Sequence, residues 1–316
     1  MTKNLPYITF LLILVLAASA CSHKEILCPP SENRQITVLF DWSNTSGAAP
    51  EGMTLYFFPA GSHEKIWRYD ISGPDGGPVE LPTGNYRMVA FNSDLPGIEI
   101  SGKDSYSEIS ANARRTSAGD YISSTGMFYG TTVNRLEVTP CGVRYSDHNG
   151  ETKECGQSVV KCCPDSLSTI FTVIFKKVGG LEQAVSATAV IHGVAAGIKI
   201  ADRMPRDVGA NLPSRLSINT ADCEMASVSS AFFPAGSNPV TIQLAVTCRD
   251  GKTYSREFDI TEQIMNSPSK HNVIIILESI NIPDGTPSSP GDEVGGIDVG
   301  VDGWSNIEID IGVTLP

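Results

Sequence analysis

Short segments of alternating apolar and polar residues, separated by turns, constrain the fold of this chain most. Four such segments come early: Gln35–Trp42, Met53–Phe58, Lys65–Ile71 and Tyr86–Phe91. A period of two is typical of a β-strand with one face on a core. The turns between them are rich in Gly and Pro, which supply positive φ and a fixed φ respectively. Many short strands with regular turns predict an all-β fold made of sandwiches or barrels.

A second strand-rich block begins at Ser168. Ile170–Phe175 is apolar on both faces, which suits the centre of a sandwich. Two segments around Arg249-Asp250-Gly251-Lys252 predict a hairpin, and Thr261–Asn266 predicts one short helical turn. The remaining predicted strands of this block are Val185–Ile191, Gly197–Ile200, Leu216–Ile218, Val228–Phe233, Val240–Cys248, Thr253–Ile260 and Val273–Leu277. The block predicts a second sandwich.

Two polar stretches lack a sustained period. Ser110–Thr125 is interpreted as a surface loop, and Cys141–Asp165 as a disulfide-stapled excursion or an interdomain connector. Near the end, Pro283–Gly296 reads as a linker, and Trp304–Ile311 as a strand that closes its own sheet or a partner's. The predicted organisation is a signal peptide (1–20), a tether (21–34), an N-terminal β-sandwich (35–140), a Cys-rich connector (141–166), a C-terminal β-sandwich (167–282), and a linker with a terminal strand (283–316).

The N-terminus has the pattern of a secretory signal. Lys3 precedes an apolar run, Ile8–Ala18, that is too short to span a bilayer. Small residues then lead directly into Cys21, which favours a lipoprotein signal with acyl chains on Cys21. The alternative is an ordinary signal peptide cut near Cys21. Ala18 stands where lipoprotein signals usually carry Leu.

The charge of the chain excludes two kinds of partner. The formal net charge is −12, which argues against nucleic acid, since phosphate binding needs clustered Lys and Arg. It also argues against docking on anionic lipid through a basic patch. Membrane attachment would therefore come from the lipid on Cys21.

Cysteines cluster in the middle of the chain. Of eight in total, four lie within one short stretch: Cys141, Cys155, Cys162 and Cys163. Outside the cytoplasm, disulfides are the default expectation. A zinc site is the alternative, but the spacing lacks the paired CxxC arrangement that such sites favour. If Cys21 is acylated, an odd number remains.

Catalytic motifs are absent from the sequence, which contains no HExxH, GxSxG or phosphate-binding glycine loop. We therefore predict no enzymatic activity and no cofactor. Weaker candidates remain: His148 as a metal ligand, a calcium site, and a sugar-stacking platform of tryptophans. The calcium candidates are Asp292, Glu293, Asp298 and Asp302, and the tryptophans are Trp42, Trp67 and Trp304. A solvated acidic tail and aromatic core packing are the simpler interpretations.

Several ordered blocks carry a resemblance that covers most of the chain after Cys21. They are Asp41-Trp42-Ser43, Pro50–Pro59, Ser72–Gly77, Leu81–Asn92, Phe258–Ile264, His271-Asn272-Val273 and Val301-Asp302-Gly303-Trp304. Together they resemble a Bacteroidetes lipoprotein family of unassigned function. That family is similar, more distantly, to the FimB-type anchor subunits of Bacteroidetes fimbriae.

The resemblance implies two transthyretin-like, or fimbrillin-like, sandwiches tethered to the outer membrane through Cys21. It implies a non-enzymatic fimbrial anchor, minor subunit or adhesion protein that joins fimbrial subunits by strand addition. The residues after the tether, Ser22-His23-Lys24-Glu25, lack the acidic run of surface-exported lipoproteins, so both faces of the outer membrane stay open. The alternative function is a glycan-binding surface lipoprotein of a polysaccharide-uptake system.

Overall fold

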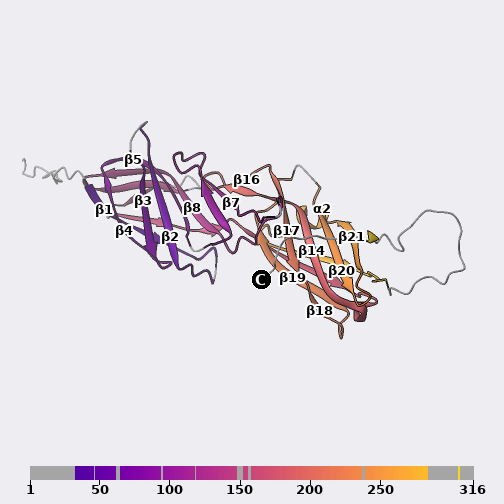
Figure 1. Cartoon of the computed structure of the whole chain (residues 1–316). Coiled ribbons are helices and arrows are strands. Elements are labelled where there is room, and N and C mark those ends of the chain that lie inside the picture. Colours follow the sequence, from indigo (N-terminus) through magenta and orange to yellow (C-terminus); the bar gives the residue numbers. More distant parts are fainter. Residues whose placement is uncertain are drawn as a thin grey trace, which may run out of the picture.

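The computed structural model describes residues 33–45, 47–61, 65–93, 95–117, 119–147, 152–155, 158–236, 239–283 and 305–306. Two β-sandwich lobes lie end to end, with the strands β7 and β16 between them (Figure 1). Within the described residues, helix is confined to a 3-10 turn, η1 (Leu181–Gln183), and to α2 (Thr261–Met265). The predicted all-β fold with two sandwiches is confirmed.

The first sandwich packs a three-stranded sheet against a seven-stranded sheet. The smaller sheet has the order β11 (Val159–Cys162), β1 (Asn33–Phe40), β4 (Gly76–Pro82). The larger runs β10 (Thr152–Cys155), β9 (Gly142–Asp147), β8 (Tyr129–Thr139), β5 (Gly84–Asn92), β2 (Gly52–Pro59), β3 (Trp67–Ser72), with β12 (Asp165–Ser166) beside β8.

Alternation explains the core of this first sandwich. Ile36 and Val38 of β1 are fully buried and face Met53, Leu55 and Phe57 of β2 in one cluster. The four early segments predicted from period-two patterns correspond to β1, β2, β3 and β5.

The second sandwich consists of two sheets that we name after their central strands. The β13 sheet has the order β18 (Ser217–Asn219), β19 (Glu224–Ala231), β13 (Thr169–Lys176), β22 (Asn272–Glu278). The β14 sheet runs β17 (Gly209–Arg215), β14 (Ala184–Ala195), β20 (Thr241–Cys248), β21 (Thr253–Asp259), β23 (Ser305–Asn306). The predicted hairpin is β20–β21, and the predicted helical turn is α2.

The prediction of a surface loop at Ser110–Thr125 is wrong. This stretch begins with β7 (Ser110–Ala113), which pairs with β6 (Ile98–Ser101) on one side and β15 (Gly197–Lys199) on the other. With β16 (Met204–Pro205), these strands form the junction sheet, to which both lobes contribute. The strand escaped prediction because its side chains are short. Ala111 and Ser110 are buried, and Ser110 donates its hydroxyl hydrogen bond to the carbonyl of Glu108 at 2.8 Å.

Aromatic side chains continue the core across the junction. Phe91 of β5 lies 5.9 Å from Phe128, and Phe128 lies 6.3 Å from Phe232 of the second lobe, measured between ring centroids. Tyr56 and Phe58 of β2 belong to the same cluster. Edge-to-face and tilted rings at these distances contribute more than their buried area alone. The two lobes therefore share one apolar cluster as well as one sheet.

The predicted connector, 141–166, is also wrong in its boundaries. β9, β10 and β12 belong to the seven-stranded sheet, and β11 pairs in parallel with β1. Val143 and Tyr145 are each 3% exposed, so β9 does alternate, but over too few residues for a period to be recognised. The first lobe therefore extends through this stretch.

The terminal strand of the prediction is described only at Ser305 and Asn306. These two residues pair with Ser255 and Tyr254 of β21, at the edge of the β14 sheet. At these positions the chain closes its own sheet. The remainder of Trp304–Ile311 lies outside the described residues, as do the signal peptide and Cys21.

Candidate functional site

The β13 sheet ends in an apolar edge strand. β22 is the last strand of this sheet and pairs in parallel with β13. In a parallel ladder, alternate residues direct their N–H and C=O groups to opposite sides. Ile276 points these groups away from β13, towards the side chain of Gln263 in α2. Ile274, two residues before it, has the same orientation. Unpaired edge groups of this kind can accept another strand.

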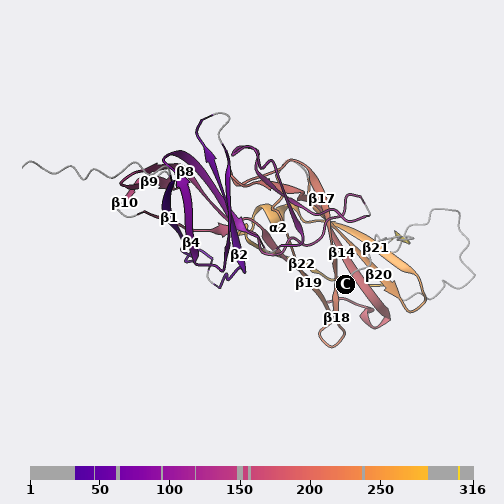
Figure 2. The ribbon, with the colours of Figure 1, turned by 60° about the vertical axis from the view of Figure 1, so that its left-hand side comes forward.

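The side-chain amide of Gln263 pairs with the backbone of Ile276, as a peptide group of a neighbouring strand would. Its Nε2 donates to the carbonyl of Ile276 at 3.2 Å, and its Oε1 accepts from the N–H of Ile276 at 3.0 Å. Figure 2 shows α2 and β22 close together in the middle of the molecule. Gln263 is exposed, so an incoming strand can displace this side chain.

The outer face of the same sheet is apolar and open. Val228, Ile274 and Ile276 are 70%, 53% and 40% exposed. The register places Thr172 of β13 between Val228 and Ile274, so that these side chains form a row across three strands. Ile174 continues the face as a half-buried side chain. Apolar residues that gather on one face typically mark an interaction surface. We call Val228, Thr172, Ile174, Ile274 and Ile276 the outer apolar face.

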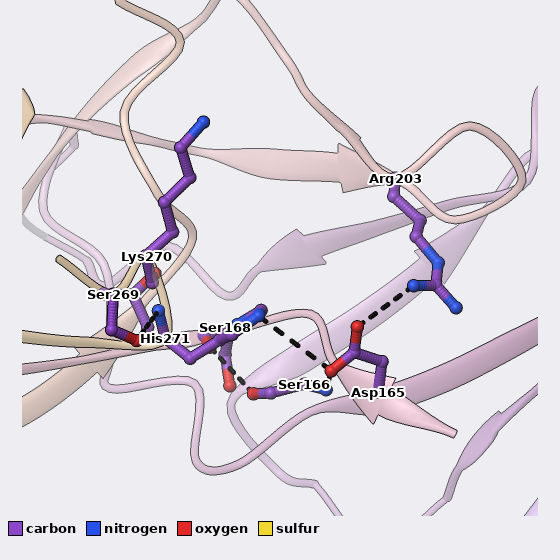
Figure 3. Close-up of polar contacts among 8 residues, drawn as sticks. Asp165, Ser166, Ser168, Arg203, Ser269, Lys270 and His271 are labelled. Carbon is purple, nitrogen blue, oxygen red and sulfur yellow. Dashed lines mark hydrogen bonds and ion pairs between the residues drawn. The ribbon is translucent and has the colours of Figure 1, made fainter. Parts of the chain in front are cut away.

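A pocket of about 320 Å³ lies at the N-terminal end of this edge. It is bounded by the segments that precede β13 and β22, by the β15–β16 turn and by the residues after β19. Figure 3 shows Asp165, one of its lining residues, between Arg203 and His271. Its apolar lining comprises Leu167, Ile198, Pro205, Phe233, Pro234 and Met265.

Polar contacts in the pocket tie three parts of the fold together. Arg203 Nη1, on the turn of the junction sheet, lies 3.1 Å from Asp165 Oδ2 in β12. Asp165 Oδ1 accepts from the N–H of Ser166 at 2.9 Å and lies 3.9 Å from Nε2 of His271, beside β22. Lys270 Nζ stands 5.4 Å from the ring centroid of Phe233. The pocket thus carries two permanent cations against one carboxylate, and His271 adds a charge when protonated.

Nothing in this site resembles nucleophilic catalysis. The rings of the two described histidines, His192 and His271, make no hydrogen bond to a serine hydroxyl or a cysteine thiol in the described structure. His192 Nδ1 contacts Asn211 Oδ1 at 2.8 Å, and Ser166 donates its hydroxyl to the carbonyl of Ser168. A nucleophile needs a base within hydrogen-bond reach.

The structure settles part of the cysteine expectation. Cys141 is disulfide-bonded, as expected, but Cys162, Cys163, Cys223 and Cys248 are not in disulfides. Cys162 is 3% exposed in β11 and packs in the first core as a small apolar side chain. Burial, with Asp250 nearby, raises the pKa of the Cys248 thiol. Within the described residues, no group of three or more His, Cys, Asp or Glu side chains could hold a metal ion.

The two described tryptophans, Trp42 and Trp67, pack against the first core. Trp42 donates from Nε1 to the carbonyl of Pro74 at 2.8 Å and packs edge-to-face on Tyr129. Trp67 is half-buried against the first core, with Lys65 Nζ 4.2 Å above its ring. Trp304, His148 and the four acidic calcium candidates lie outside the described residues. Among the described residues, no helix has the length and apolar character needed to cross a membrane.

Sequence reasoning missed the pocket. Asp165, Arg203 and the adjacent pair Lys270-His271 are far apart in the chain, and no spacing links them. One weak signal was available, since Lys270 and His271 directly precede a fully apolar strand. Their meeting depends on the junction sheet, of which β15 was predicted as a strand but β7 as part of a loop.

Comparison with known proteins finds a matching family model and a relative that matches part of the chain. The model of a family described as a domain of unknown function, DUF5119, matches residues 20–213. A Bacteroides ovatus protein provisionally named fimbrium anchoring subunit Fim4B is 32% identical over 107 residues. That match covers 32% of this chain and 31% of the relative. The chain therefore spans about a third of the length of the relative.

Solved structures share the fold. A Bacteroides ovatus protein provisionally described as an adhesin superposes with a TM-score of 0.65 at 18% identity, covering 85% of this chain and 98% of that one. The fimbrial anchor protein Mfa2 from Porphyromonas gingivalis superposes with a TM-score of 0.51 at 10% identity, covering 78% of this chain and 90% of that one. At such identities the likeness shows the two-sandwich fold.

Proposed function

The chain belongs to the DUF5119 family, and from that premise we propose that it is a non-enzymatic fimbrial anchor, minor subunit or adhesion protein of the outer membrane. The observation that carries the proposal is the β22 edge with the outer apolar face beside it. Strand addition at such an edge supplies main-chain hydrogen bonds, while side chains on one face supply specificity. The provisional name of Fim4B and the fold of Mfa2 support the same role.

The junction between the lobes suits a tether that bears tension. β7 and β15 exchange backbone hydrogen bonds across the boundary, and the N–H of Thr125 donates to the carbonyl of Ser230 at 2.9 Å. Phe128 and its neighbours add a shared core. A pull applied to one lobe therefore passes to the other through a sheet and a packed cluster, without a flexible linker between them.

We further propose that the lipid on Cys21 attaches the protein to the outer membrane. The net charge of −12 argues against attachment to anionic lipid through a basic patch. In cells fed labelled palmitate, the wild-type protein should carry label and sediment with outer membranes. The Cys21→Ser variant should carry none and should not sediment. Labelled, membrane-bound C21S protein would contradict this attachment.

A pull-down from outer-membrane extracts tests the role. Wild-type protein should recover a fimbrial or surface-protein partner. Replacing Ile274 and Ile276 by Asp should abolish that recovery, because charge on the outer apolar face opposes its burial. The matched control is Val185→Asp on β14, since Val185 is 62% exposed on the other sheet. Recovery of no surface protein by wild type, or equal recovery by all variants, would refute the proposal.

A further inference from the structure

The pocket lies where a strand added along β22 would end. Ile276 and Ile274 direct their edge groups outward, and His271 comes five positions before Ile276. At about 3.3 Å per residue, this distance is about 17 Å. A bound segment of about five or six residues would thus bring its next residue to the pocket mouth at His271 and Lys270.

The charge of the pocket differs from that of the chain. The whole chain carries a net charge of −12, yet Arg203 and Lys270 line the pocket against the single carboxylate of Asp165. Asp165 is engaged by Arg203 and by the N–H of Ser166. Lys270 has no carboxylate partner among the described residues. A ligand with a negative charge would balance it.

Arg203 retains an unused donor. Its Nη2 is buried and has no hydrogen-bond partner in the described structure, while Nη1 is held by Asp165. A buried donor left unsatisfied is destabilising, and a guanidinium group can serve two acceptors at once. An anionic ligand oxygen would satisfy this donor and leave the Asp165 contact in place.

The walls of the pocket select for an apolar substituent. Leu167, Phe233 and Met265 line the cavity beside the charged groups. Sugar acids present hydroxyl groups that require many polar partners, whereas the Ser166 and Thr169 hydroxyls of the lining already donate to backbone carbonyls. A carboxylate on a peptide, next to an aliphatic side chain, matches both the charge and the walls.

We propose that the interdomain pocket binds a carboxylate that is carried next to an apolar side chain in a peptide segment. The carboxylate lies in the pocket between Lys270 and Arg203, which attract it from opposite sides, and Leu167, Phe233 and Met265 take the side chain. The identification of the peptide as a strand bound along β22 rests on the proposed function. The preference of the pocket for a carboxylate next to an apolar side chain is independent of that function.

Three small probes test the pocket in the full chain carrying Cys21→Ser. They are N-acetyl-L-leucinate, its neutral amide and D-glucuronate, each titrated by ligand-observed NMR. We expect leucinate to bind at least about fivefold more tightly than the amide, which lacks the charge, and than glucuronate, which lacks the aliphatic group. Equal binding of leucinate and amide, or no binding of leucinate, would overturn the proposal. Stronger binding of glucuronate would assign the pocket to sugar acids instead.

Two substitutions locate the binding. Lys270→Gln should weaken leucinate about fivefold and leave the amide unchanged. The matched control is Lys252→Gln, an exposed lysine in the β20–β21 turn, which should leave both unchanged. Equal loss in both variants would contradict binding in this pocket. One further outcome is that leucinate binds as expected while the outer-membrane pull-down recovers no partner. That result would refute the proposed strand addition and support the proposed binding of a carboxylate in the pocket.

Discussion

The seven-stranded sheet and the β13 sheet are both apolar on two faces, but only the first is covered on both. Tyr56 and Phe58 turn away from the first core, yet they are 6% and 3% exposed because the junction packs on them. Val228 and Ile274 turn away from the second core and are 70% and 53% exposed. The first sheet uses its second face to join the lobes, and the second sheet keeps its outer face available for a partner.

This difference explains why substitutions on equivalent faces should have unequal effects. On the covered face, a large side chain contributes to stability through packing. On the open face, it contributes mainly to association, since little of it is removed from water in the free protein.

Phe128→Ala should have the largest effect. Phe128 is fully buried and contacts Phe91 and Phe232 across the lobe boundary. The cavity left behind should lower the free energy of unfolding by about 3–5 kcal/mol. Urea denaturation followed by tyrosine and tryptophan fluorescence measures it. A loss below about 1 kcal/mol would mean that the junction packs loosely.

Gly197→Ala should have the next largest effect. A Cβ at this position would lie 2.7 Å from the carbonyl oxygen of Ala111, on the paired strand β7. The strands must separate, which should lower the free energy of unfolding by about 1–3 kcal/mol. The same denaturation measurement applies. The control is Gly209→Ala, because a Cβ at Gly209 would meet nothing closer than 3.9 Å. This variant should change the free energy of unfolding far less. Gly251→Ala would not serve as the control, since Gly251 has a φ of +81° that alanine adopts only with strain.

Gln263→Leu should weaken the protection of the β22 edge. The variant loses both hydrogen bonds to Ile276, and two neutral bonds at an exposed site contribute about 1 kcal/mol together. Amide hydrogen exchange at Ile276 should become faster, and recovery of the partner should increase because the edge is open. Slower exchange at Ile276, or reduced partner recovery, would contradict the role of Gln263 as a displaceable group.

Ile274→Thr should have the smallest effect on stability. Threonine keeps the β-branched shape, and the side chain is already 53% exposed, so the free energy of unfolding should change by no more than about 0.5 kcal/mol. Ile275→Thr, at a fully buried neighbour, provides the contrast and should cost several times more. Similar losses for both variants would show that the outer face is covered in the free protein.

Much of the fold follows from local pattern. β1 alternates between apolar and polar residues, and β2 and β13 are mostly apolar over six or more residues, so local pattern identifies these strands without tertiary information. Local pattern does not identify β7 and β9, because β7 buries small and polar side chains and β9 is short. Their assignment depends on partners distant in sequence. Likewise, the apolar pattern of β22 predicts a buried strand, and only the tertiary arrangement shows that Ile274 and Ile276 are exposed.

The pocket could not be predicted for the same reason. Arg203 meets Asp165 through the junction sheet, and Lys270 joins them through the parallel pairing of β22 with β13. Both arrangements bring together residues that are remote in the chain. The prediction of a lipid on Cys21 depends only on local sequence and stays a prediction.

Photo-cross-linking at position 274 tests the central claim most directly. A photoreactive phenylalanine analogue in place of Ile274, expressed in the native bacterium, should yield an adduct with a fimbrial or other surface protein. The same analogue in place of Val185, which is 62% exposed against 53% for Ile274 but lies on the β14 sheet, should yield none. No adduct at position 274, or the same adduct at both positions, would contradict a docking role for the β22 edge and its outer apolar face.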